Sequence, residues 1–127
     1  MKTDSSEVKV VNTKEKLDLI QKYWDPKIAG EMNDDKVQLV KIKGQFVWHH
    51  HEKEDELFYV LKGHLIVHFR DYDVHVKEGE FVIVPKMLEH MTEAHEETHL
   101  LYIEPKQAVN TGNITDSKYT AKNQEKI

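Results

Sequence analysis

Apolar and polar residues alternate with a period of two from about residue 27 to residue 105. This period is typical of β-strands, because successive side chains of a strand point to opposite faces of the sheet. Short stretches rich in glycine, asparagine, aspartate or paired charges, such as Glu96-Glu97, interrupt the alternation and predict turns. The predicted strands lie at residues 27–32, 37–43, 46–50, 57–61, 65–69, 73–76, 81–84, 89–94 and 99–104. Many short strands at regular spacing predict an all-β sandwich or barrel.

A helical pattern precedes the strands. Asn12 and Glu15 have the spacing of a capping box, in which each side chain bonds the backbone amide of the other residue. Apolar residues follow at helical spacing, namely Leu17, Ile20 and Trp24. We therefore expect one short amphipathic helix over residues 13–23, which Pro26 prevents from continuing.

The length of 127 residues suits a single domain with its own core. We divide the chain into an N-terminal arm with the short helix (1–26), the barrel (27–105) and a polar C-terminal tail (106–127). The tail is expected to lie along the surface and then to fray.

Composition narrows the classes of function. The net charge is -5 and the basic residues are scattered among acids, which argues against nucleic acid as a partner. The chain has no cysteine, so disulfides and thiolate metal sites are excluded. The polar first residues do not resemble a signal peptide, and no apolar run is long enough to span a membrane. We expect a cytoplasmic protein with no membrane partner.

The candidate chemistry lies in the histidines, of which the chain has nine. His49 and His51 point to the same face of their predicted strand, whereas His50 points to the other. Glu56 opens the next predicted strand, and a hairpin would bring it back beside this pair. His90, which follows another predicted strand, is the best-placed fourth group.

Three imidazoles and one carboxylate suit a single divalent first-row transition metal ion. This donor set does not select among Fe, Mn, Ni, Zn, Co and Cu. On spacing alone the histidine run could equally form a solvated loop, so both interpretations stay open at this point.

The stretch from Gly44 to Gly63 resembles the first motif of the cupin superfamily, in which HxH is followed by a glutamate and then a glycine. Four residues separate His51 from Glu56 and six separate Glu56 from Gly63, as in that motif. The spacing from Gly44 to His49 is one residue shorter than usual and would select His50 instead. We prefer His49 because it shares a face with His51.

The stretch from Gly79 to Ala94 resembles the second cupin motif, with Pro85 and His90 at the expected places. Met87 replaces a glycine of that motif, and Ala94 replaces its final asparagine. Both motifs occur in the right order, and the resemblance covers about residues 35–105. The chain therefore resembles a small single-domain cupin.

The resemblance implies a jelly-roll barrel, also called a double-stranded β-helix, with one metal ion held by His49, His51, Glu56 and His90. It also implies a small-molecule ligand inside the barrel and a homodimer. Four aromatic residues are candidates for lining the ligand pocket, namely Phe46, Trp48, Phe58 and Tyr59, and Tyr102 could present its hydroxyl to the site. Five further histidines are expected to face solvent, namely His64, His68, His75, His95 and His99.

Two classes of function remain. The chain could be a metal-dependent enzyme, resembling a dioxygenase or a sugar isomerase, although no separate general base stands out and the catalytic residues are unknown. Alternatively, it could be a non-catalytic, metal-dependent protein that binds or senses a small ligand. A phosphorylated sugar would need a cationic cluster that the sequence does not offer.

Overall fold

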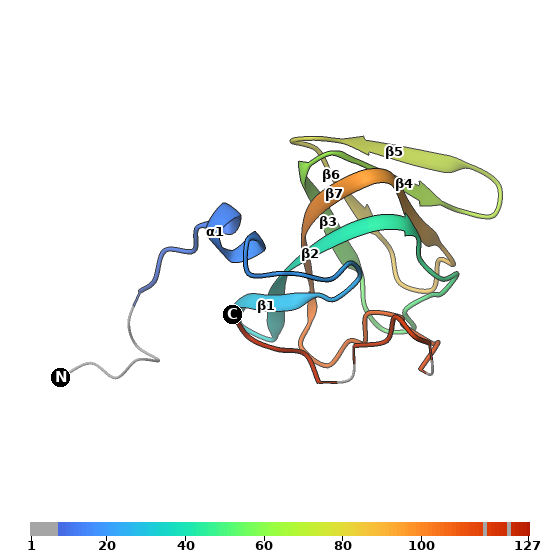
Figure 1. Cartoon of the computed structure of the whole chain (residues 1–127). Helices are drawn as coiled ribbons and strands as arrows, with labels where there is room; N and C mark the ends of the chain where they lie inside the picture. The colour runs from blue at the N-terminus through green and yellow to red at the C-terminus, as the bar shows by residue number, and fades with distance from the viewer. Residues whose placement is uncertain (1–7, 116, 122) are drawn as a thin grey trace.

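The computed structural model of the chain describes residues 8–115, 117–121 and 123–127. Within these residues, seven strands form one curved sheet that closes into a barrel, with one short helix beside it (Figure 1). The predicted all-β jelly-roll fold with a short N-terminal helix is therefore confirmed. The elements are α1 (Thr13–Leu17), β1 (Lys27–Met32), β2 (Asp35–Gln45), β3 (Glu56–Lys62), β4 (His64–His68), β5 (Asp73–Lys77), β6 (Phe81–Val84) and β7 (Met91–Pro105).

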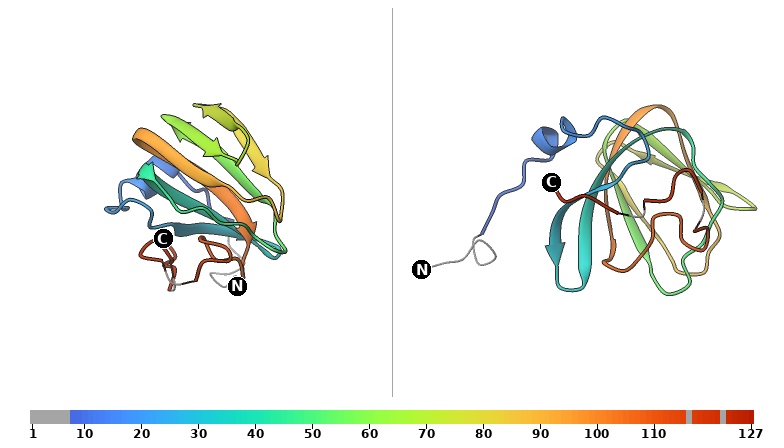
Figure 2. Two further views of the ribbon diagram at one scale, coloured as in Figure 1. Left: turned by 90° about the vertical axis from the view of Figure 1, so that its right-hand side faces the viewer. Right: turned by 60° about the horizontal axis from the view of Figure 1, so that its bottom comes forward.

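The long strand β7 connects the parts of the sheet. Along one path the strand order is β1-β2-β7-β3-β6, and β7 also pairs with β4, which pairs with β5. Ile103, near its end, is opposite Val37 of β2 and Leu57 of β3, whereas Thr92, near its start, is opposite Val67 of β4. Figure 2 shows β7 running between β2 and the strands on its other side. The strand β7 therefore joins β4 and β5 to the rest of the sheet.

The predicted turn at Glu96-Glu97 is wrong, because β7 runs through it without a break. Ala94 is opposite Gly44 and Thr98 is opposite Ile42. The exposed residues 95–97 therefore form a bulge against a single residue of β2. A bulge bends a strand and increases its twist without ending it. The polar residues that predicted a turn mark this bend.

The helix is shorter than predicted. Asn12 caps it as expected, since its side chain accepts a hydrogen bond from the amide of Glu15 over 3.0 Å. After Leu17 the backbone tightens, with the Ile20 amide donating to the Leu17 carbonyl over 3.0 Å. Trp24 then donates its amide to the carbonyl of Lys41 in β2. Pairing with the sheet replaces the last turns that the sequence pattern predicted.

The interior of the barrel holds the main apolar core, and a smaller cluster of Leu17, Ile20 and Leu39 lies beneath the helix. The segment after β7 lies across one end of the barrel (Figure 2). The amide of Asn113 in this segment donates to the carbonyl of His50, and the amide of Ile127 donates to that of Ile28. In the described part of the chain, no helix is both long and apolar enough to cross a membrane.

Candidate metal centre

The predicted strand at residues 46–50 does not form as a regular strand, which corrects that expectation. Its backbone instead pairs at single points. The amide of His49 donates to the carbonyl of His90 over 3.0 Å, and the reverse bond is 2.9 Å. On the other side, the amide of His50 donates to Asn113 Oδ1 over 2.9 Å. Neighbouring residues take different partners, so neither side forms a continuous ladder.

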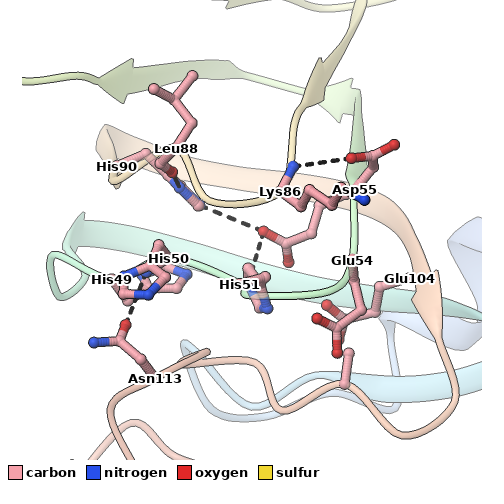
Figure 3. A network of polar contacts seen from close by, with 12 residues as sticks. His49, His50, His51, Glu54, Asp55, Lys86, Leu88, His90, Glu104 and Asn113 are labelled. Atoms are coloured by element: carbon pink, nitrogen blue, oxygen red, sulfur yellow. Dashed lines mark hydrogen bonds and ion pairs between the residues drawn. The ribbon is translucent and has the colours of Figure 1, made fainter.

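The structure brings the four predicted residues together in one buried cluster. Figure 3 shows the three histidines of this cluster, His49, His51 and His90. Each offers one ligand atom, and these atoms all lie within 4.8 Å of one another. Exposure is 3% for His49, 4% for His51, 2% for Glu56 and 1% for His90. Two ligands come from the segment before β3, one from the first residue of β3 and one from the residue before β7.

Backbone carbonyls orient two of the imidazoles. His49 Nδ1 lies 2.9 Å from the carbonyl oxygen of Val47, and His90 Nδ1 lies 2.9 Å from that of Leu88. A carbonyl can only accept, so each Nδ1 carries the proton and each Nε2 keeps its lone pair. This arrangement is typical of metal-binding histidines, whose second nitrogen donates to a carbonyl or carboxylate.

The centre of the cluster contains polar atoms without partners. Glu56 Oε1 lies 2.9 Å from His51 Nε2 and 3.4 Å from His90 Nε2. In spite of this proximity, none of the three atoms has a hydrogen-bond partner among the described residues. Buried polar atoms are nearly always paired. Three converging nitrogen and oxygen atoms without partners fit a transition metal ion.

The charges of the cluster suit a cation. Burial alone would raise the pKa of Glu56, but its contacts with His51 and His90 outweigh burial and hold the pKa well below its usual range. Burial, together with the neighbouring His90, lowers the pKa of His49 to about 4. At neutral pH the cluster therefore offers an ionised carboxylate and a neutral His49, the forms in which these side chains bind metals.

A cavity opens beside the cluster and is reached by His49 and Glu56. Its walls are mostly aromatic and aliphatic. The apolar lining residues are Trp24, Pro26, Val40, Ile42, Phe46, Phe58, Leu100 and Tyr102. The remaining polar ones are Thr92 and Asn110. Mostly apolar walls with a few polar groups are typical of small-molecule sites.

A family model described as "Cupin domain" matches residues 36–104, which is more than half of the chain. The chain belongs to the cupin family. This confirms the resemblance drawn from the two motifs, and all four clustered residues of this cupin lie within the match.

Individual relatives agree with this assignment. The uncharacterized protein YdbB of Bacillus subtilis (strain 168) is 40% identical over 80 residues, which cover 62% of this chain and 71% of that protein. A crystal structure of a cupin-2 domain containing protein from Shewanella frigidimarina is 41% identical, with a TM-score of 0.75, and covers 76% of this chain and 95% of that one.

A 3-hydroxyanthranilate 3,4-dioxygenase of Xenopus tropicalis is a more distant relative. It is 28% identical over 95 residues, which cover 69% of this chain. The match spans only 34% of that dioxygenase.

Sequence reasoning missed a buried carboxyl group of this cupin next to the cluster. Glu104 is 1% exposed, and burial together with the neighbouring charge of Glu56 raises its pKa well above the usual range. Gln38 Nε2 donates to Glu104 Oε1 over 3.1 Å. Lys36 Nζ lies 3.8 Å from the same oxygen and instead donates to the carbonyl of Ala108 over 2.9 Å. The available signal was the alternation, which places Lys36 and Gln38 on the inward face of β2.

Only some of the aromatic residues expected at the pocket line the cavity. Phe46, Phe58 and Tyr102 line the cavity, whereas Trp48 and Tyr59 do not. Trp48 instead packs beneath the guanidinium of an arginine, and Trp24 takes a place in the wall that the sequence did not predict. The side chains of the cluster are in place, and their role as metal ligands remains a prediction.

Proposed function

We propose that this cupin binds one divalent transition metal ion through His49, His51, Glu56 and His90 and acts as a metal-dependent enzyme on a small molecule. The observation that carries the proposal is the convergence of His51 Nε2, His90 Nε2 and Glu56 Oε1, all buried and without hydrogen-bond partners among the described residues. Fe, Mn, Ni, Zn, Co and Cu all suit three imidazoles and a carboxylate.

The chain's own residues prepare the site for chemistry. The carbonyls of Val47 and Leu88 hold the rings of His49 and His90 with Nε2 free. Glu56 contributes one negative charge, so a divalent ion bound here would keep one net positive charge. Such an ion, when bound, supplies Lewis acidity or a binding place for oxygen. The apolar cavity then excludes bulk water from the reacting molecule.

The cavity favours a dioxygenase-like reaction over the isomerisation of a sugar phosphate. None of the described residues that line it is a lysine or arginine, although phosphate recognition relies on such groups. The similarity to a 3-hydroxyanthranilate 3,4-dioxygenase points in the same direction. A non-catalytic binding protein is the alternative, and turnover distinguishes the two.

The first experiment is elemental analysis of the untagged protein, since a His-tag would bring its own ligands. We expect about one equivalent of a transition metal in the wild type and none in a His51→Ala/His90→Ala double variant. The matched control is His64→Ala/His75→Ala, which removes two exposed histidines that bond each other over 2.8 Å. This control should keep its metal. A wild type that neither contains nor takes up any of the six metals contradicts the proposal.

The metal-containing protein is then assayed with oxygen against catechols, diketones, thiols and sugar phosphates. Metal-dependent turnover supports an enzyme, and ligand-dependent stabilisation without turnover supports the binding protein.

We also propose that the protein is a cytoplasmic homodimer. Phe81 and Ile83 of the edge strand β6 are 62% and 54% exposed, and apolar exposure at a sheet edge favours pairing with a second copy. Light scattering tests the dimer, and cell fractionation tests the location. A monomeric mass contradicts the first.

A further inference from the structure

Two stacked aromatic pairs form walls of the cavity beside the metal cluster. Trp24 stacks on Phe46, with ring centroids 4.8 Å apart and an interplanar angle of 19°. Phe58 stacks on Tyr102 at 5.6 Å and 25°. All four rings line the cavity. Walls made of aromatic rings suit a flat molecule, because aromatic rings interact best when stacked with an offset or edge to face.

The backbone of Trp24 has a conformation that residues with large side chains rarely adopt. Its φ of 61° lies in the left-handed region, where a bulky residue is an outlier. Two hydrogen bonds fix it there: its amide donates to the carbonyl of Lys41 over 2.9 Å, and its indole Nε1 donates to that of Lys43 over 3.0 Å. Strained residues that the surrounding structure fixes in this way cluster at binding sites.

The same wall touches a metal-binding candidate directly. Phe46 meets His49 edge to face, with centroids 5.4 Å apart at 84°. Tyr119 of the C-terminal segment packs against Phe46 at 5.3 Å and against Trp24 at 5.9 Å. Trp24 and Tyr119 both lie outside residues 36–104, the part that matches the cupin model. Trp24 and Asn110 line the cavity, so segments on both sides of the matched part contribute to its wall.

The charge of the cavity limits what it can accept. Of the lining residues that the structure describes, Glu56 is the charged one, and none is a lysine or arginine. Beside a divalent cation this leaves one positive charge, which one anionic group on a ligand neutralises. A second anionic group would be buried without a cationic partner, which is costly.

We propose that this cavity binds a small, flat, apolar molecule, aromatic or conjugated, that has one metal-binding group and no second charge. This inference rests on the metal site proposed above and names the substrate class of that site. Trp24 is the specificity-determining residue, because its ring lines the cavity and stacks on Phe46, the ring that contacts His49.

The test uses zinc-loaded protein, because zinc is redox-inactive and does not quench fluorescence. Three probes share a carboxylate and differ in the rest: benzoate is flat and apolar, cyclohexanecarboxylate is apolar but not flat, and phosphoglycolate is polar and has a second anionic group. In a Trp48→Phe background, Trp24 is the remaining tryptophan and reports binding. Benzoate should change its emission at concentrations at least about tenfold lower than the other two probes do.

A second measurement examines the wall itself through the shift in melting temperature caused by benzoate. Trp24→Gly removes the ring and leaves a residue that tolerates the left-handed backbone. It should weaken benzoate binding by about tenfold, which corresponds to the binding free energy of one aromatic contact. The matched control is Trp48→Ala, which removes the tryptophan outside the cavity and should leave binding unchanged.

Zinc content is measured on the same samples. Protein that contains no zinc overturns the metal site and this inference with it. Zinc-loaded protein that binds phosphoglycolate or cyclohexanecarboxylate as tightly as benzoate overturns the inference alone. Equal benzoate affinity in Trp24→Gly and wild type also overturns it, and zinc content in that variant shows that the site has folded.

Discussion

His49 and His90 are bound to each other through both of their backbones, with N···O distances of 3.0 and 2.9 Å, and their ring centroids lie 4.4 Å apart. Each ring is also held by the carbonyl of the residue two positions earlier, Val47 or Leu88. The two histidines therefore have the same local support and are fixed relative to each other before any ion binds. Such preorganisation reduces the ordering that metal binding requires.

Glu56→Gln should reduce metal affinity by at least about tenfold, because it replaces the one charged donor by a neutral amide of the same shape. Competition with a chromophoric chelator measures the change. The control is Glu54→Gln, a nearby glutamate outside the cluster, which should bind metal like the wild type. Unchanged affinity in Glu56→Gln would exclude this carboxylate from the ligands.

The metal-free protein should lose stability as the pH falls from 6.5 to 4. Burial, together with His90, lowers the pKa of His49 from 6.5 to about 4, so the unfolded chain binds a proton in this range that the folded protein does not. By linkage, the neutral His49 contributes its full share to the free energy of unfolding above pH 6.5. As the pH falls to 4, this free energy decreases by roughly 3 kcal/mol at most. Urea unfolding at several pH values measures it. His49→Gln should show a shallower dependence, and an identical slope would contradict the assignment.

His68 should make the folded protein more stable at low pH than at high pH, which is the opposite of the effect of His49. Its imidazole bonds Glu93 and Asp73, both over 2.6 Å, and these bonds raise its pKa above 6.5. The folded protein therefore holds this proton more tightly than the unfolded chain does. The resulting stability is fully present below pH 6.5 and is lost as the pH rises through the raised pKa. The destabilisation caused by His68→Gln should accordingly be larger at pH 6 than at pH 9, and equal values would rule out this contribution.

Gly112→Ala should displace the C-terminal segment from the proposed metal site. Its φ is 56°, and an added Cβ would overlap the backbone carbonyl of His50 and lie 3.1 Å from His49 Cδ2. Gly79→Ala is the matched control, because its φ is 85° but nothing lies within 4 Å of the added atom. Both variants incur a backbone cost of about 1 kcal/mol. Only Gly112→Ala should also weaken metal binding in the chelator assay, and equal effects of the two variants would show that the contact with His50 does not support the site.

Local sequence determined most of the strands and the identity of the clustered side chains. A period of two assigns each residue to a face, which is why residues 27–32 and 81–84 were predicted with the bounds that the structure shows. The spacing of His49, His51 and Glu56 alone left a solvated loop open as an alternative, and the resemblance to the cupin motifs selected these residues, although the strand assumed at residues 46–50 does not form. His90 followed from the order of the two motifs.

Only the tertiary structure decided how the site is enclosed. Trp24 reaches the cavity because its backbone pairs with β2 instead of continuing the helix, and Asn113 bonds His50 because the C-terminal segment crosses the end of the barrel. Glu104 lies beside Glu56 through the pairing of β7 with β3. These contacts join residues far apart in the sequence, and no local pattern encodes them. Their free energy depends on packing and burial, which exist only after the chain has folded.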